Sequence, residues 1–87
     1  MERALVQAMN SKPFIKGLLC ADSNGLAITS KGELSPAFAG RYSSLARHAS
    51  SLYPDAGPPT ILIETNERRI IVKDYDSMTV VMSLDSM

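Results

Sequence analysis

The longest helical pattern in this chain spans residues 35–52, and strand-like runs lie on both sides of it. Ser35 followed by Pro36 favours a helix start, because serine caps free backbone amides and proline fits the first helical position. Projected at roughly 100° per residue, the larger and smaller apolar side chains share one arc. The members of this arc are Phe38, Ala39, Tyr42, Leu45, Ala46, Ala49 and Leu52. The pattern predicts an amphipathic helix.

Five runs with strand character surround this segment. Residues 14–21 and 26–32 precede it and are separated by Asp22-Ser23-Asn24-Gly25. Asn-Gly between two such runs indicates a hairpin, because both residue types tolerate positive φ. Residues 60–66, 68–74 and 78–84 follow, with links too short for anything but hairpins. A short amphipathic helix at residues 2–10 completes a predicted order of α-β-β-α-β-β-β.

The charge balance argues against a nucleic-acid partner. Nine basic and nine acidic side chains give the 87 residues a net charge of zero, whereas binding to nucleic acid needs a basic face. Residues 1–50 hold six Lys/Arg and three Asp/Glu, and residues 51–87 hold three and six, so the halves carry about +3 and −3. This polarity favours pairing with another protein.

The ends of the chain and its single cysteine bear on where the protein resides. One cysteine excludes an internal disulfide framework and favours a reducing compartment. The first ten residues lack the apolar core of a signal peptide, and neither end holds a myristoylation or prenylation motif. We therefore expect any contact with a membrane to be indirect, through a partner.

Cys20 is the one candidate nucleophile, and its setting argues against catalysis. A reactive thiol needs a nearby base, but the only histidine, His48, projects on the polar side of the predicted helix. Cys20 itself lies within an apolar strand, so a buried and inert cysteine is the better interpretation. The run after it, from Asp22 to Gly25, lacks the later oxygen ligands of a calcium loop and is read as a turn.

The other possible sites are explained more simply by structure. Asp74-Tyr75-Asp76 is interpreted as a solvated turn between two strands, although paired acids in a cleft are the alternative. One histidine and one cysteine cannot form a zinc site alone, and no glycine-rich phosphate loop is present. Ser35-Pro36 is a possible kinase target, but a capping role explains it. We expect no catalytic residue, metal or cofactor.

A partner surface is the remaining hypothesis. Small side chains border the apolar arc of the helix and favour close approach of another helix, although simple solvent exposure is the alternative. The strand at residues 60–66 contains no lysine or proline to protect it as a sheet edge. The predicted interface consists of Ala39, Ser43, Ala46, Arg47, Ser50, Ile61, Leu62, Ile63 and Glu64.

The joint spacing of several residues resembles a known family, the roadblock/dynein-light-chain type of domain. The resemblance covers essentially the whole chain and is carried by Cys20, Asp22-Ser23, Gly25-Leu26, Gly32, Leu34-Ser35, Ala39-Gly40, Leu45-Ala46, Glu64 and Thr79-Val80. It implies one roadblock-like (profilin-like) α/β domain over residues 1–87. This domain has an antiparallel five-stranded sheet and no C-terminal third helix.

Within that family the chain looks most like the hepatitis B X-interacting type of subunit in the late endosomal and lysosomal adaptor Ragulator. The resemblance implies a non-catalytic scaffold that forms a heterodimer with another roadblock-like subunit through the second helix and third strand. It also implies a lipidated wrapping subunit, Rag GTPases and TOR signalling at the cytoplasmic surface of lysosomes. The alternative is a self-associating roadblock module that regulates a small GTPase or motor elsewhere. The turns at Glu67-Arg68 and Asp76-Ser77 lack the glycines usual in the family.

Overall fold

The computed structural model describes residues 14–75 and 77–86 of the chain. The described elements are β1 (Ile15–Ala21), β2 (Ala27–Gly32), a 3₁₀ turn η1 (Pro36–Phe38), α2 (Ala39–Leu52), a second 3₁₀ turn η2 (Pro54–Ala56), β3 (Thr60–Glu64), β4 (Arg68–Tyr75) and β5 (Met78–Asp85). The helix expected at residues 2–10 lies outside the described residues. The order of the other predicted elements is confirmed.

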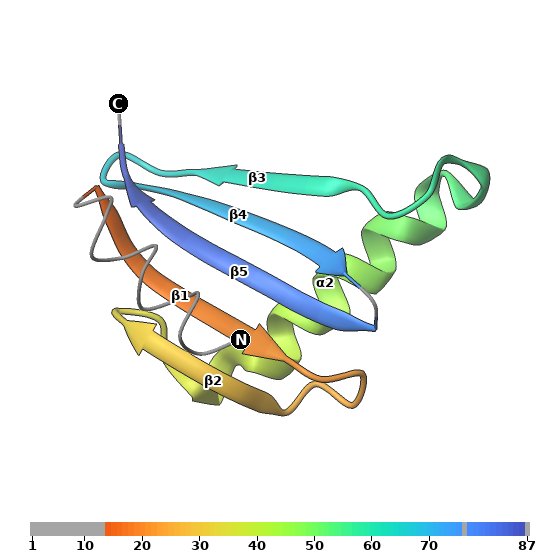
Figure 1. Ribbon diagram of the computed structural model, residues 1–87. Coiled ribbons are helices and arrows are strands. Elements are labelled where there is room, and N and C mark those ends of the chain that lie inside the picture. The colour runs from red at the N-terminus through yellow and green to blue at the C-terminus, as the bar shows by residue number, and fades with distance from the viewer. Residues whose placement is uncertain (1–13, 76, 87) are drawn as a thin grey trace.

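The five strands form one antiparallel sheet in the order β2-β1-β5-β4-β3. β2 and β3 are therefore the two edges, and they lie on opposite sides of the sheet. α2 links them by crossing one face of the sheet diagonally (Figure 1). Both faces of β1 are largely buried, so this strand reads as a near-continuous apolar run, whereas β5 buries one face fully and the other only in part. The predicted antiparallel sheet with β3 at an edge is confirmed.

The start of α2 differs in detail from the prediction. The Ser35 hydroxyl accepts a hydrogen bond from the amide of Ala37 at 3.2 Å, so the expected capping role is confirmed. It caps a 3₁₀ turn, however, and the α-helix itself begins at Ala39. Within this turn, the amide of Phe38 donates to the carbonyl of Ser35 at 3.1 Å, which is the hydrogen bond of a 3₁₀ turn.

The side chain of Asp22 holds the turn of the first hairpin, a role that the sequence analysis did not predict. One carboxylate oxygen of Asp22 accepts the amides of Asn24 at 2.9 Å and Leu26 at 3.0 Å. Gly25 alone takes positive φ, at 82°, and Asn24 does not. The turn is thus an Asx-type turn closed by a left-handed glycine, and the hairpin predicted from Asn24-Gly25 is confirmed.

The two later turns form without glycine by different means. At the β3–β4 turn, the Thr65 hydroxyl accepts the amides of Glu67 and Arg68, which replaces the backbone freedom of a glycine with side-chain hydrogen bonds. At the β4–β5 turn, Ser77 itself adopts a left-handed φ of 67°. Residues other than glycine take this conformation only rarely.

The core has a layer on each face of the sheet. Beneath α2, a cluster of apolar side chains joins the helix to the strands and consists of Leu19, Ala21, Leu34, Ala39, Ala46, Val72 and Val81. On the opposite face, Ile15, Leu18 and Leu84 form a second cluster. Between them they bury both sides of β1, so this strand anchors the domain.

Candidate functional site

The small side chains of α2 pack against the sheet of their own chain. Ala39, Ser43 and Ala46 are all buried, and Tyr42 packs beside them on the same core cluster. Small residues let a helix approach a sheet closely, which explains why they occupy this face. The expectation that these three side chains face a partner is therefore corrected, because the domain core already covers them. Of their predicted neighbours, Arg47 is exposed and Ser50 is half-buried.

The large apolar side chains of α2 lie on the flank beside this buried face. Leu52 is 72% exposed, Leu45 is 36% exposed, and Phe38 just before the helix is also exposed. The spacing of seven residues from Phe38 to Leu45 to Leu52 places all three on one side of the helix. Sequence reasoning placed them on one continuous arc with the alanines and did not separate the two groups. Their size was the available signal, because a closely seated helix has no room for leucine.

Two cationic or polar side chains accompany these leucines. Arg41, Leu45, His48 and Leu52 follow at spacings of four, three and four residues, which keeps them in one line along the helix. We call these four residues the outward stripe; each of them is exposed. The Arg41 guanidinium lies 4.8 Å from the centre of the Phe38 ring, so an aromatic face holds it in place.

β3 supplies the second part of the surface. α2 packs mainly on β1, β4 and β5, so β3 extends beyond the area that the helix covers. Ile61 and Ile63 are half-buried on the helix side of the sheet, while Leu62 is 54% exposed on the other side and Glu64 is exposed. Among the described residues, no strand pairs with the outer edge of β3.

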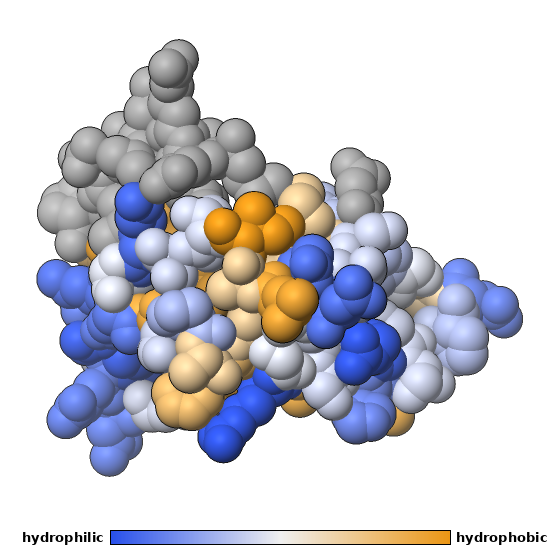
Figure 2. All heavy atoms as spheres, turned by 90° about the horizontal axis from the view of Figure 1, so that it is seen from below, coloured by the Kyte–Doolittle hydropathy of each residue, from blue (hydrophilic) through white to orange (hydrophobic). Residues whose placement is uncertain are grey.

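The two sheet edges differ in how well they are protected. β2 contains Lys31, and its pairing with β1 has a register shift at Cys20 and Ala21. Lysine and irregular pairing both discourage a further strand from joining an edge. β3 contains neither lysine nor proline and pairs with β4 without a shift. Figure 2, which views the molecule from below, shows hydrophobic atoms gathered near the middle of this face with hydrophilic atoms on both sides. β3 is the better edge for strand addition.

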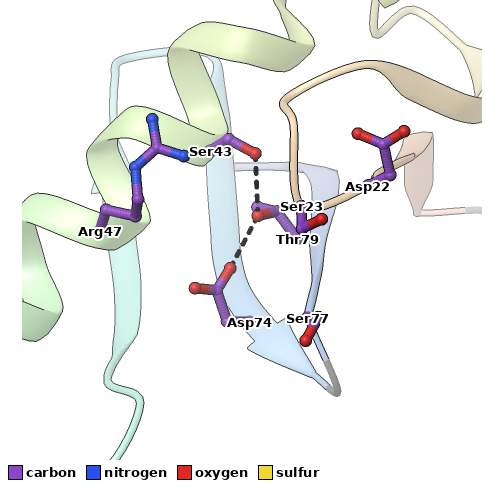
Figure 3. A pocket seen from close by; sticks show the side chains of 7 residues that line it. All are labelled: Asp22, Ser23, Ser43, Arg47, Asp74, Ser77 and Thr79. Carbon is purple, nitrogen blue, oxygen red and sulfur yellow. Dashed lines mark hydrogen bonds between the residues drawn. The ribbon is translucent and has the colours of Figure 1, made fainter.

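A polar pocket of about 180 Å³ lies where α2 meets the first hairpin and the β4–β5 turn (Figure 3). Within it, Thr79 donates to Asp74 at 2.7 Å, and the Ser43 and Thr79 hydroxyls lie 3.1 Å apart. Since the Thr79 proton is committed to Asp74, Ser43 donates to Thr79. Asp74 is thus half-buried and hydrogen-bonded at the end of β4, and its interpretation as part of a solvated turn was wrong. These bonds tie α2 to the sheet.

Cys20 lies buried in β1, as predicted. Its thiol donates to the sulfur of Met78 at 3.8 Å, and burial raises the pKa of the thiol. A raised pKa keeps the sulfur protonated and weakens it as a nucleophile. His48 is exposed on α2, outside the buried clusters. The geometry thus gives Cys20 the role of a small core side chain.

An ion-pair network stands at the opposite end of the sheet from the polar pocket. Arg68 of β4 donates to Glu33 at 2.8 Å and also pairs with Asp85 at 3.4 Å. Glu33 further accepts a hydrogen bond from Ser83 of β5. The Arg68 and Ser83 hydrogen bonds lower the pKa of Glu33. The network joins the segment after β2 to the strands β4 and β5.

The described residues hold no group of three or more His, Cys, Asp or Glu side chains placed to share a metal ion. Over the same part of the chain, no helix is long and apolar enough to cross a membrane. The surface that combines exposed apolar side chains with a free sheet edge is thus the candidate functional site, made of the outward stripe and β3.

Comparison with solved structures shows the fold. The chain superimposes on a Roadblock/LC7 domain from Streptomyces avermitilis with a TM-score of 0.73 and 18% identity, covering 92% of this chain and 73% of that one. It also matches the gliding protein MglB of Thermus thermophilus with a TM-score of 0.76 and 15% identity, covering 95% and 69% of the two chains. At these identities the likeness extends to the fold, which is roadblock-like as predicted.

Comparison of sequences shows the family. The family model described as Ragulator complex protein LAMTOR5 matches residues 1–83. A LAMTOR5 homolog from Nematostella vectensis is 33% identical over 76 residues, covering 86% of this chain and 84% of the relative. LAMTOR5 of Xenopus tropicalis is 34% identical over 84 residues, covering 92% of each. This chain therefore belongs to the LAMTOR5 family of Ragulator complex proteins.

Proposed function

We propose that this protein is a non-catalytic scaffold subunit that forms a heterodimer with another roadblock-like subunit of Ragulator. The assembled complex would hold Rag GTPases at the lysosome and support TOR signalling in response to amino acids. Family membership supports a place in Ragulator. A lipidated subunit that wraps the roadblock-like pairs would hold the complex at the membrane, so this chain would reach the membrane only indirectly.

The observation that carries the pairing step is the position of the large apolar side chains. A helix flank that exposes Leu45 and Leu52 leaves apolar area in water, and covering such area is the main favourable term in protein association. β3 offers an unprotected edge whose backbone amides and carbonyls can extend the sheet into a partner. The interface we propose keeps Ile61, Leu62, Ile63 and Glu64 of β3. On the helix, it replaces the buried small residues with the outward stripe.

Two features of the interior support a non-catalytic role. The single thiol is buried and its pKa is raised. The polar groups of the pocket are already hydrogen-bonded to one another, between α2 and the β4–β5 hairpin. Neither arrangement presents an activated nucleophile or a base to a substrate. A scaffold role uses the exposed flank of α2 and leaves these groups to structure.

Affinity purification of the tagged full chain from its native cell tests the proposal. We expect the other Ragulator subunits and Rag GTPases to co-purify with the wild-type chain. Leu52→Glu should reduce their recovery about tenfold or more, because a carboxylate on the outward stripe would be buried against an apolar partner. Ser51→Glu, which adds the same charge at an exposed position about 100° around the helix from Leu52, is the matched control and should recover them normally.

Recovery of the chain only as a self-associated species, without Ragulator subunits, would contradict the proposal. It would support the alternative of a self-pairing roadblock module. Equal recovery by Leu52→Glu and wild type would contradict the choice of helix flank.

A further inference from the structure

The loop between β2 and α2 holds the one serine or threonine of the chain that is followed by proline, in the pair Ser35-Pro36. Leu34, just before this pair, is buried and belongs to the core cluster beneath α2, so the loop is fixed to the domain at that point. The next four residues, from Ser35 to Phe38, are all exposed. The fold thus presents the Ser-Pro pair at the surface, beside a fixed point of the core.

The backbone at Ser35 has the shape that a protein kinase requires of its substrate. Its φ of −78° and ψ of 133° are extended, which the ring of the following proline favours. Kinase clefts bind the residues around the acceptor hydroxyl in an extended form, and a segment that is already extended loses less entropy on binding. Pro36 also has no amide N–H, so a kinase site that offers no acceptor at this position leaves no donor unpaired. Kinases with such a site are proline-directed.

The capping role of Ser35 does not conceal its hydroxyl. The oxygen accepts one hydrogen bond, from the Ala37 amide at 3.2 Å, and this bond is exposed to water. Among the described residues, no acceptor takes the proton of the Ser35 hydroxyl. Because water competes for an exposed hydrogen bond, breaking it costs little. Capping and phosphorylation can therefore use the same side chain.

The start of α2 lacks the negative charge that stabilises a helix N-terminus. α2 contains no aspartate or glutamate, and Phe38 at its N-cap makes no side-chain hydrogen bond to the helix. The nearest carboxylate in the preceding loop, that of Glu33, is held by Arg68 and Ser83. A phosphate brings roughly two negative charges and several strong acceptor oxygens, so on Ser35 it would supply the missing charge.

We propose that Ser35 is the acceptor site of a proline-directed protein kinase and that its phosphate stabilises the first turns of α2. In the reaction, the Ser35 Oγ attacks the γ-phosphorus of ATP and the bond from that phosphorus to ADP breaks. The hydroxyl proton passes to the catalytic base of the kinase. The site does not depend on where the chain pairs. Phe38, which follows Ser35 by three residues, is exposed at the start of the flank proposed for pairing, so the phosphate adds charge beside that surface.

Kinase assays on the full-length chain test the acceptor. The chain is incubated with a purified mitogen-activated protein kinase and ATP, and mass spectrometry of its peptides locates the phosphate. We expect one phosphate, on Ser35, and none on exposed serines without a following proline, such as Ser51. Pro36→Ala keeps the hydroxyl but restores an amide N–H, and should slow phosphorylation at least about tenfold. Ser35→Ala should abolish it.

A synthetic peptide of residues 30–41 separates recognition of the sequence from access in the folded chain. Phosphorylation of the peptide alone, or of neither peptide nor chain, would overturn the inference. Equal rates for wild type and Pro36→Ala would overturn it as well, because the kinase would then not select proline. The chain purified from its native cell with phosphatase inhibitors should also contain phosphate at Ser35. Recovery of only the unmodified peptide from that sample would contradict the proposal.

Hydrogen exchange of the phosphorylated and unmodified chains tests the effect on α2. Amides of residues 39–42 should exchange at least about threefold more slowly in the phosphorylated chain at low salt, and about 0.5 M NaCl should remove most of the difference. The last turn of α2, around Leu52, is the internal control and should not change, because the effect of the charge fades within the first turn. Unchanged or faster exchange at residues 39–42 would overturn the stabilising role of the phosphate.

Discussion

The hydroxyl of Ser43 in α2 lies 3.1 Å from the hydroxyl of Thr79 in β5, and both residues are buried. Thr79 in turn donates to Asp74 at 2.7 Å, so a directed chain of hydrogen bonds runs from the helix to the end of β4 (Figure 3). Ser43 packs on the sheet between Ala39 and Ala46, so its hydroxyl is shielded from water and donates its hydrogen bond to Thr79. This link holds α2 in place and thereby turns its leucine-bearing flank outward.

Replacing Ser43 with alanine should destabilise the domain by about 1 kcal/mol, because a buried hydrogen bond is lost while its acceptor keeps its other partner. Chemical denaturation of the full chain measures the change in the free energy of unfolding. Ser44→Ala on the same helix is the control and should change stability by less than about 0.5 kcal/mol. Equal effects from the two variants would show that the bond contributes nothing.

Glu33 should make stability depend on pH in the acidic range. Its pKa is lowered below the ordinary 4.5 by the hydrogen bonds from Arg68 and Ser83, so the folded state binds this proton less readily than the unfolded state. The contribution to stability is thus present above about pH 4.5 and is lost as the pH falls through the lower, folded-state pKa. The side chains are about a third exposed, so solvent screening keeps the effect modest.

Denaturation of Glu33→Gln at a series of pH values tests this assignment. The variant should be less stable than wild type at pH 7, and the difference should disappear at a pH below the folded-state pKa of Glu33. Glu64→Gln, at the exposed end of β3, should show a much smaller dependence. A constant difference across the whole acidic range would mean that the charge of Glu33 is not responsible.

Gly32 should be intolerant of any side chain. Its φ is 72°, and an added Cβ would come within 2.2 Å of the Lys16 carbonyl oxygen, which is fixed in the β1 backbone. Gly32→Ala should therefore cost about 3 kcal/mol or more. Gly57→Ala is a matched comparison, since Gly57 has a similar φ of 79° but no atom within 4 Å of its Cβ position. If the two substitutions cost the same on denaturation, backbone strain alone would explain both.

Cys20 should react with thiol reagents only when the domain opens. The thiol is fully buried and its pKa is raised, so labelling of the folded chain is expected to be at least about 100-fold slower than labelling in denaturant. Destabilising variants such as Gly32→Ala should speed labelling in proportion to the population of the open state. Rapid labelling of stable, folded wild type would show that Cys20 is accessible and would reopen a catalytic role.

The sequence predicts the strands well because their signals are local. Branched residues mark β4 and β5, and the turn residues from Asp22 to Gly25 mark the first hairpin, so the predicted strand limits differ from the observed ones by at most two residues. The detailed turn geometry was not predicted, because the Asp22 carboxylate competes with the usual Asn-Gly conformation. Side-chain hydrogen bonds of this kind depend on the positions of individual atoms, which a pattern of residue types does not specify.

The helix surface was harder to predict than the helix itself. Ala46 and Leu45 are adjacent in the sequence and belong to the same predicted arc, yet the first is buried and the second is partly exposed. Leucine is more hydrophobic than alanine, so a prediction from hydrophobic periodicity expects the leucine to be the buried residue. The tertiary structure reverses this order, because α2 crosses the sheet at a distance that suits alanine and serine. Whether a partner then covers the leucines stays a prediction.

The most direct measurement is hydrogen exchange of the full chain alone and within Ragulator purified from its native cell. If the outward stripe and β3 face the partner, amides of Thr60–Glu64 should exchange at least about tenfold more slowly in the complex, because the strand edge becomes hydrogen-bonded. The last turns of α2 around Leu52 should slow as well, while the edge strand Ala27–Gly32 should change little. Slowing confined to Ala27–Gly32, with β3 unchanged, would contradict this account of the pairing surface.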